Sequence, residues 1–140
     1  MKFSDSISYL LSKVAAAHRK TLEKSVKSIG LHGGQVFVLM ELWKKDGQRQ
    51  IDLAGCLGLS PPTVNKILGG LLEGDFVTRA KYEDDARSTR IYLTKKGEDA
   101  QVALERQWEE LEEQTIINLT DTEALLLKQL LTRMLEQVDI

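Results

Sequence analysis

Cysteine and proline are scarce in this 140-residue sequence, and long apolar runs are absent from it. The single cysteine, Cys56, excludes an intramolecular disulfide, and the chain is long enough to bury a core without one. No stretch reaches the roughly 20 apolar residues that a membrane-spanning helix needs. Residues 1–6 lack the charged and apolar regions of an export signal, so we expect a cytoplasmic protein.

The motifs of common catalytic and metal sites are missing as well. The sequence has no glycine-rich phosphate loop, no Gly-x-Ser-x-Gly elbow and no His-Glu-x-x-His. Its two histidines, His18 and His32, do not stand at metal-ligand spacing from each other or from Cys56. We therefore expect no enzyme, no cofactor and no metal, which leaves binding as the class of function.

Positive charge is concentrated in the first two thirds of the chain. The net charge of −2 by itself argues against a nucleic-acid partner. However, residues 1–96 hold 16 Lys/Arg against 10 Asp/Glu, whereas residues 97–140 hold 3 against 11. This asymmetry indicates a basic working part joined to an acidic part that faces away from nucleic acid. We expect the acidic run at 105–113 to be a solvated helix face.

Apolar residues recur at helical spacing in several segments, and turn residues separate these segments. Two segments rich in β-formers, 76–81 and 89–93, flank a charged tip and predict a hairpin. Ser60, Thr94 and Thr120 are expected helix caps, and Gly74 is expected to end its helix in a left-handed conformation. The predicted helices span 4–28, 32–45, 49–57, 61–73, 94–114 and 120–138.

The same periodicity predicts which side chains point inward. Gly33 and Gly34 are weak helix formers, so the start of the second helix is expected to fray. The small residues around Cys56 favour a buried thiol. The inward positions include Ile51, Leu53, Ala54 and Leu57 in the short helix, Val102, Leu104, Trp108 and Leu111 in the fifth, and Leu126, Leu127, Leu130, Leu131, Met134 and Leu135 in the last.

A short helix, a tight turn, a second helix and a charged hairpin form the order of a winged helix-turn-helix. The fold is therefore expected to be mainly α with a small β-hairpin wing. Polar groups at the start of the second of these helices can read base edges, and cations on the wing can reach the neighbouring groove or its backbone. The expected DNA-binding residues are Arg49, Ser60, Pro62, Thr63, Asn65, Lys66, Arg87, Ser88 and Arg90, with Arg79 and Asp85 as support for the wing.

Three stretches of this sequence resemble the MarR-type transcriptional regulators. They are residues 31–39, residues 53–60, and the wing from 74 to 97, where Asp85-Ala86-Arg87 matches the family's Asp-x-Arg motif. The resemblance implies a homodimer built from the terminal helices, a palindromic operator, and repression relieved by a small ligand, an oxidant or a metal. It also implies one compact domain in which 1–30 and 96–140 dimerise and 31–95 binds DNA.

The resemblance further implies residues for dimerisation and for an effector. An effector pocket between the dimer helices and the winged module, suited to a small aromatic or phenolic compound, would bring His18, Trp43 and Trp108 near it. The expected dimer interface consists of Phe3, Ile7, Leu10, Leu11, Leu127, Leu130, Leu131 and Met134.

Two alternatives stay open from the sequence. The winged fold can serve as a protein-interaction module that never binds DNA, because only Lys66 is cationic in its recognition helix. Alternatively, Cys56 can act as a redox-sensing thiol that moves the regulator off DNA.

The wing motif generates a direct test. The Arg87→Ala variant should lose affinity for operator DNA while keeping its fold, because a wing cation contacts DNA and not the core. Gel-shift titration measures the affinity and circular dichroism checks the fold. Unaltered DNA binding would refute the role assigned to the wing.

Overall fold

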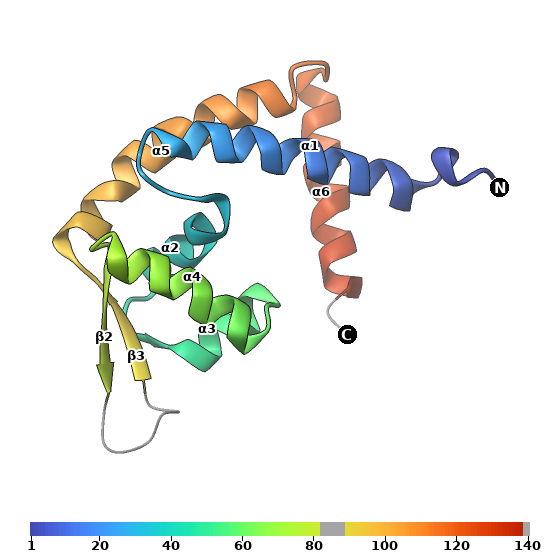
Figure 1. The fold of residues 1–140 in the computed structure, drawn as a ribbon. Coiled ribbons are helices and arrows are strands. Elements are labelled where there is room, and N and C mark those ends of the chain that lie inside the picture. Colours follow the sequence, from blue (N-terminus) through green and yellow to red (C-terminus); the bar gives the residue numbers. More distant parts are fainter. Residues whose placement is uncertain (82–88, 139–140) are drawn as a thin grey trace.

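Helices make up most of the computed structural model, which describes residues 1–81 and 89–138 (Figure 1). The expected mainly helical fold with a small β-structure is confirmed. None of the helices in these ranges is both long and apolar enough to cross a bilayer. The elements are η1 (Phe3–Asp5), α1 (Ile7–Lys27), α2 (Gly33–Lys44), β1 (Gln48–Arg49), α3 (Gln50–Leu57), α4 (Pro61–Glu73), β2 (Val77–Lys81), β3 (Thr89–Leu93), α5 (Lys95–Thr115) and α6 (Asp121–Val138).

The sheet has one strand more than the sequence predicted. Its antiparallel order is β1-β3-β2, and Gln48 of the additional strand β1 pairs with Ile91. Gly47, at φ +71°, bends the chain toward β3, and its carbonyl accepts a hydrogen bond of 2.9 Å from the Arg90 guanidinium. A strand of two residues carries no readable alternation, so only the pairing with β3 reveals it.

The hydrophobic core is centred on α2, which packs against α1, α3, α4, α5 and β3. Val36, Val38, Leu39 and Leu42 of this helix are at most 1% exposed. Such a helix has almost no free side, in keeping with its high apolar content. The other core side chains are Leu22, Val26, Leu31, Leu53, Ala54, Val64, Leu68, Leu71, Phe76, Val77, Ile91, Ala100, Leu104 and Leu111.

The predicted helix caps are confirmed. The Ser60 and Thr94 hydroxyls accept hydrogen bonds from the backbone N–H groups of Thr63 (3.4 Å) and Gly97 (3.0 Å). At the start of α6, Thr120 donates its backbone N–H to Glu123, at 2.9 Å, and its hydroxyl accepts from the Glu123 N–H, at 3.2 Å. Hydrogen bonding by the backbone N–H and then the side chain of Thr120 lowers the pKa of the Glu123 carboxyl. Local sequence signals therefore place the helix starts correctly.

The expected left-handed Gly74 is wrong by one position. Gly74 has φ −79°, and the left-handed residue is Asp75, at φ +63°. The turn closes because Phe76 donates its backbone N–H to the Leu71 carbonyl, at 3.0 Å. Aspartate tolerates this conformation better than most residues, so Gly74 caps α4 with a right-handed φ and the left-handed turn falls on Asp75.

The start of α2 is held in place and not left to fray. The backbone N–H of Gly33 donates to the Glu23 carboxylate at 2.7 Å, and that of His32 donates to the Gln35 side chain at 2.9 Å. A Cβ on Gly33 would lie 2.8 Å from Glu23 Oε1. The glycine thus permits a close contact between α1 and α2 that offsets its poor helix propensity.

Several residues expected to point inward are exposed. Ile51 and Val102 are 56% and 67% exposed, and Cys56 is exposed on α3. No side chain of α6 that the structure describes is buried within the chain. Periodicity identifies an apolar stripe but not its partner, and one chain offers α6 nothing to pack on. The exposed side chains of α6 include Leu126, Leu127, Leu130, Leu131, Met134 and Leu135.

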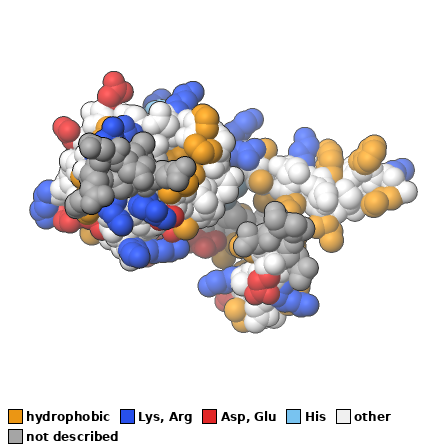
Figure 2. All heavy atoms as spheres, turned by 90° about the horizontal axis from the view of Figure 1, so that it is seen from below, with side chains coloured by type: hydrophobic (Ala, Val, Ile, Leu, Met, Phe, Trp, Pro, Cys, Tyr) orange, Lys and Arg blue, Asp and Glu red, His pale blue; other side chains and the backbone are white. Residues whose placement is uncertain are grey.

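The N-terminal part of α1 and the whole of α6 extend away from the core as arms (Figure 1). Helices α1 and α5 lie side by side, and α6 turns away from the C-terminal end of α5 and passes behind α1 in this view (Figure 1). Seen from below, hydrophobic side chains stand in the open along the arm that ends at the N-terminus (Figure 2). The arms therefore carry a large apolar surface that one chain leaves in water.

The glycines of α4 and α5 generate a matched stability test. Gly97 packs against the backbone just before β2, since a Cβ there would clash with the Phe76 carbonyl oxygen, whereas a Cβ on Gly69 would meet nothing within 4 Å. Gly97→Ala should lower the free energy of unfolding by about 1–3 kcal/mol. Gly69→Ala should raise it by up to about 1 kcal/mol through helix propensity. Urea titration measures both, and equal effects would contradict the packing described.

Candidate nucleic-acid interface

A tight turn joins α3 to α4 and sets the start of α4. Gly58 ends α3 at φ +63°, a conformation that favours glycine, and Leu59 donates its backbone N–H to the Ala54 carbonyl at 3.0 Å. Ser60 then caps α4, and Pro61 occupies its first turn, where a missing N–H costs nothing. The helix-turn-helix expected from the sequence is therefore present.

Helix α4 divides into a buried edge and an exposed polar face. Val64, Leu68 and Leu71 have no exposed surface. The buried edge fixes how the helix is turned about its axis, so its polar face must point to solvent. The exposed residues at its N-terminal end are Ser60, Pro62, Thr63, Asn65 and Lys66, as the sequence predicted.

Asn65 joins three elements of this surface. Its Oδ1 accepts hydrogen bonds from Gln50 Nε2 of α3, at 3.3 Å, and from Arg79 Nη2 of β2, at 3.5 Å. Gln50 was not among the expected site residues, and Arg79 was expected to support the wing alongside Asp85, which lies outside the described residues. The partners stand 14 and 15 positions from Asn65, so no local spacing signals them.

Two of the expected DNA-binding arginines are engaged with other groups of the protein. Arg49 donates two hydrogen bonds to the Asp52 carboxylate, of 2.9 and 3.1 Å. Hydrogen bonding to Asp52 raises the pKa of Arg49, and the same bond lowers the pKa of the Asp52 carboxyl. Arg90 is half-buried and donates to the carbonyl of Gly47. Arg87 and Ser88 lie outside the described residues.

Unpaired positive charge lies on the same side as the polar face of α4. Lys66, Arg79 and Lys81 are exposed, and none of them forms an ion pair with another residue in the described ranges. Figure 2 shows Lys and Arg side chains gathered on the lower face of the winged region. The exposed N-terminus of α4 adds a partial positive charge to this surface. Lys81 was missed from the sequence because strand position alone does not show which side chains face α4.

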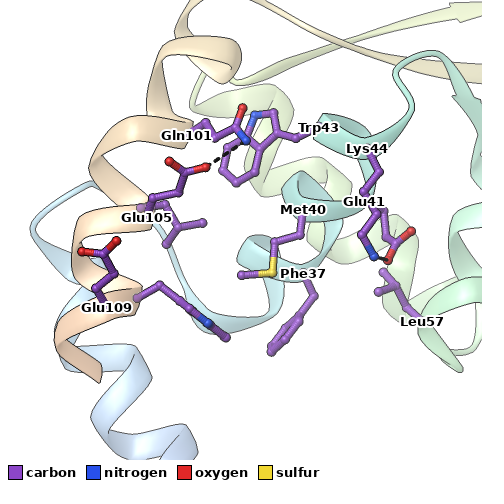
Figure 3. Close-up of a pocket in the computed structure, with 11 residues that line it drawn as sticks. Phe37, Met40, Glu41, Trp43, Lys44, Leu57, Gln101, Glu105 and Glu109 are labelled. Carbon is purple, nitrogen blue, oxygen red and sulfur yellow. Dashed lines mark hydrogen bonds and ion pairs between the residues drawn. The ribbon is translucent and has the colours of Figure 1, made fainter. Parts of the chain in front are cut away.

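The aromatic residues proposed for a ligand site separate into two groups. Trp43 and Trp108 line a cavity of about 630 Å³ between α2 and α5 (Figure 3). His18 is not part of this lining, but its ring meets the edge of Trp108 at 6.4 Å between centroids. The family resemblance implied these three positions for an effector pocket, whereas the rest of the lining depends on packing. The further lining residues are Phe37, Met40, Glu41, Lys44, Leu57, Gln101, Leu104, Glu105 and Glu109.

The residues expected at a dimer interface all lie on the arms. Those of η1 and α1 are Phe3, Ile7, Leu10 and Leu11, which are 43–89% exposed. Those of α6 are Leu127, Leu130, Leu131 and Met134, which are 37–42% exposed.

Known proteins share both the central sequence and the overall fold. Residues 31–89 match the model of the MarR family, and no curated protein matches the chain. A MarR transcriptional regulator from Methanosarcina mazei superposes with a TM-score of 0.85 at 25% identity, covering 94% of each chain. MepR in its DNA complex from S. aureus has a TM-score of 0.77 at 25% identity, covering 95% of this chain and 96% of its own.

A MarR protein from Peptoclostridium difficile is similar over an even larger part of the chain. Its TM-score is 0.87 at 21% identity, over 99% of this chain and 92% of its own. The sequence match covers the helix-turn-helix and the first part of the wing, and the structural likeness extends to the arms. The chain therefore has the winged-helix fold of these structures, and the match over residues 31–89 supports a MarR-type transcription regulator.

Proposed function

We propose that this chain binds duplex DNA as a homodimer and represses transcription until a small molecule releases it. The observation that carries the proposal is the division of α4, whose polar N-terminal end is exposed while its other edge is buried. A helix held in this way can enter a major groove without rearrangement. Ser60, Thr63 and Asn65 then supply hydroxyl and amide groups at the depth of the base edges.

The charges around α4 support contact with the phosphate backbone. Lys66 stands on α4 itself, while Arg79 and Lys81 lie on β2, so the three cations flank the polar face. Arg79 also donates to Asn65 Oδ1, which orients the amide of a base-reading residue. Phosphate contacts of this kind position a protein on DNA, and base contacts select the sequence.

The apolar arms support a homodimer. Phe3 and Ile7 are 89% and 73% exposed, and Leu130 is 42% exposed. A second copy would remove these side chains from water, which contributes roughly 25 cal/mol per Å² before entropic costs. A two-fold interface through the arms would set two copies of α4 about one DNA turn apart and match a palindromic operator.

The cavity between α2 and α5 supports control by a small aromatic ligand. Its wall includes Leu57, the last residue of α3, while α5 begins directly after β3. A ligand there would contact both the winged helix-turn-helix region, through α2 and the end of α3, and α5, the helix that leads to α6. It would favour whichever spacing of the two heads it binds better, and so change the affinity for DNA.

DNA binding is tested by removing the unpaired cations. Lys66→Ala and Arg79→Ala should each weaken DNA binding by a similar factor whatever the DNA sequence. Each should also reduce the slope of log Kd against log salt concentration by about 1 per lost phosphate contact. Fluorescence anisotropy with labelled DNA at several salt concentrations measures this. Lys20→Ala, an exposed lysine of α1, serves as the control and should change little. Absence of salt-dependent DNA binding, together with salt-insensitive pull-down of one protein, would favour a protein-interaction module instead.

The homodimer is tested at the centre of α6. Leu130→Glu should give monomers, because a carboxylate would have to be buried in an apolar interface. The control Gln129→Glu adds the same charge at the neighbouring exposed position and should leave the dimer intact. Sedimentation velocity measures both. A dimer of Leu130→Glu that persists at low micromolar concentration would refute the interface.

A further inference from the structure

We propose that the cavity between α2 and α5 binds a planar aromatic cation, and not the phenolic or carboxylate compound that an aromatic pocket alone would accept. This inference rests on the proposed regulatory function and adds the charge of the effector to it. The cavity volume, about 630 Å³, falls within the range of sites for drug-sized molecules.

The walls of the cavity offer aromatic surfaces. Trp43 donates its indole N–H to the Gly97 carbonyl, at 3.0 Å, so its polar atom is satisfied within the protein. Phe37 and Trp108 meet edge to face at 6.1 Å between centroids, with an angle of 88° between the rings. Together with the thioether of Met40, these side chains form an adaptable apolar lining (Figure 3). Tryptophan is also the aromatic side chain that attracts cations most strongly.

The charged groups of the lining are mostly carboxylates. Glu41, Glu105 and Glu109 face a single cation, Lys44. Lys44 lies 3.4 Å from Glu41 Oε1, so the two charges largely offset each other. Figure 3 shows Glu105 and Glu109 on α5, across the cavity from the aromatic residues of α2.

Glu105 and Glu109 have no cationic partner in the described part of the chain. Glu105 accepts a hydrogen bond of 3.1 Å from the neutral amide of Gln101, which leaves its charge unbalanced. The two positions are one turn apart on α5, and both residues line the cavity. In Figure 3 the Glu105 carboxylate points toward Gln101 and Trp43, and that of Glu109 lies farther out on α5. An aromatic anion placed there would be repelled, whereas a cation would gain both carboxylate attraction and a cation–π contact. The acidic run expected as a solvated face therefore contributes two residues to a binding cavity.

The test uses three naphthalene compounds of one shape and different charge. They are (2-naphthylmethyl)trimethylammonium, the neutral 2-naphthylmethanol, and 2-naphthylacetate, each titrated calorimetrically into the full chain without DNA. The cation should bind at least tenfold more tightly than the anion, and this ratio should shrink as salt rises. Equal or tighter binding of the anion, or no binding of any compound, would overturn the proposal.

The two carboxylates are tested with a matched pair of variants. Glu105→Gln combined with Glu109→Gln should reduce the preference for the cation about tenfold and leave the neutral compound unchanged. Glu112→Gln combined with Glu113→Gln removes the same charge from exposed positions of α5 outside the lining, and should keep the preference. Loss of preference in both pairs, or in neither, would assign the selectivity to something other than this wall.

A DNA-binding assay separates this inference from the proposed function. Retention of promoter DNA is measured first without any compound, and its absence would refute the regulator and leave the titration result standing. Where DNA is retained, the cation should release it at concentrations near its own Kd. The Glu105→Gln/Glu109→Gln variant should need an about tenfold higher concentration of the cation to release DNA. Release at equal concentrations from the variant and from the unmodified protein would overturn the regulatory role of the cavity.

Discussion

The exposure of the polar face of α4 depends on the burial of the opposite edge of this helix against the core. Val64, Leu68 and Leu71 are fully buried, so α4 cannot turn about its axis without exposing them. Gly70 permits a close approach to α2, because a Cβ there would lie 2.5 Å from Gln35 Nε2. The Oε1 atom of Gln35 in turn accepts a hydrogen bond from the backbone N–H of His32 and so caps the start of α2. The polar end of α4 faces solvent as a consequence of this packing.

The distribution of charge follows from the same arrangement. The cations of α4 and β2 gather on one face, whereas the carboxylates of α5 lie on the helix that leads to the arms. Net charge, at −2, conceals this separation. Two of the carboxylates, Glu105 and Glu109, also line the cavity that α5 forms with α2. This cavity lies between α2 of the winged region and α5, the helix that leads to α6.

Helices and their starts could be predicted from the sequence because their signals are local. Ser60, Thr94 and Thr120 cap helices through bonds that span three residues, and such bonds are written into adjacent positions. Predictions that required a distant partner were less successful. Ile51 and Val102 were expected inside and are exposed, and β1 was not foreseen because its partner lies more than 40 positions away.

The sequence by itself determined the order of elements, the polar end of α4 and the family resemblance, since these depend on periodicity, capping and short motifs. Only the tertiary structure decided that Gln50, Asn65 and Arg79 meet, and that Glu105 and Glu109 line one cavity together with aromatic side chains. The physical reason is that packing joins residues from separate helices and strands, and no spacing along one chain encodes which faces will touch. The apolar arms show the same limit, because their stripe can be read from the sequence but its burial depends on a second surface.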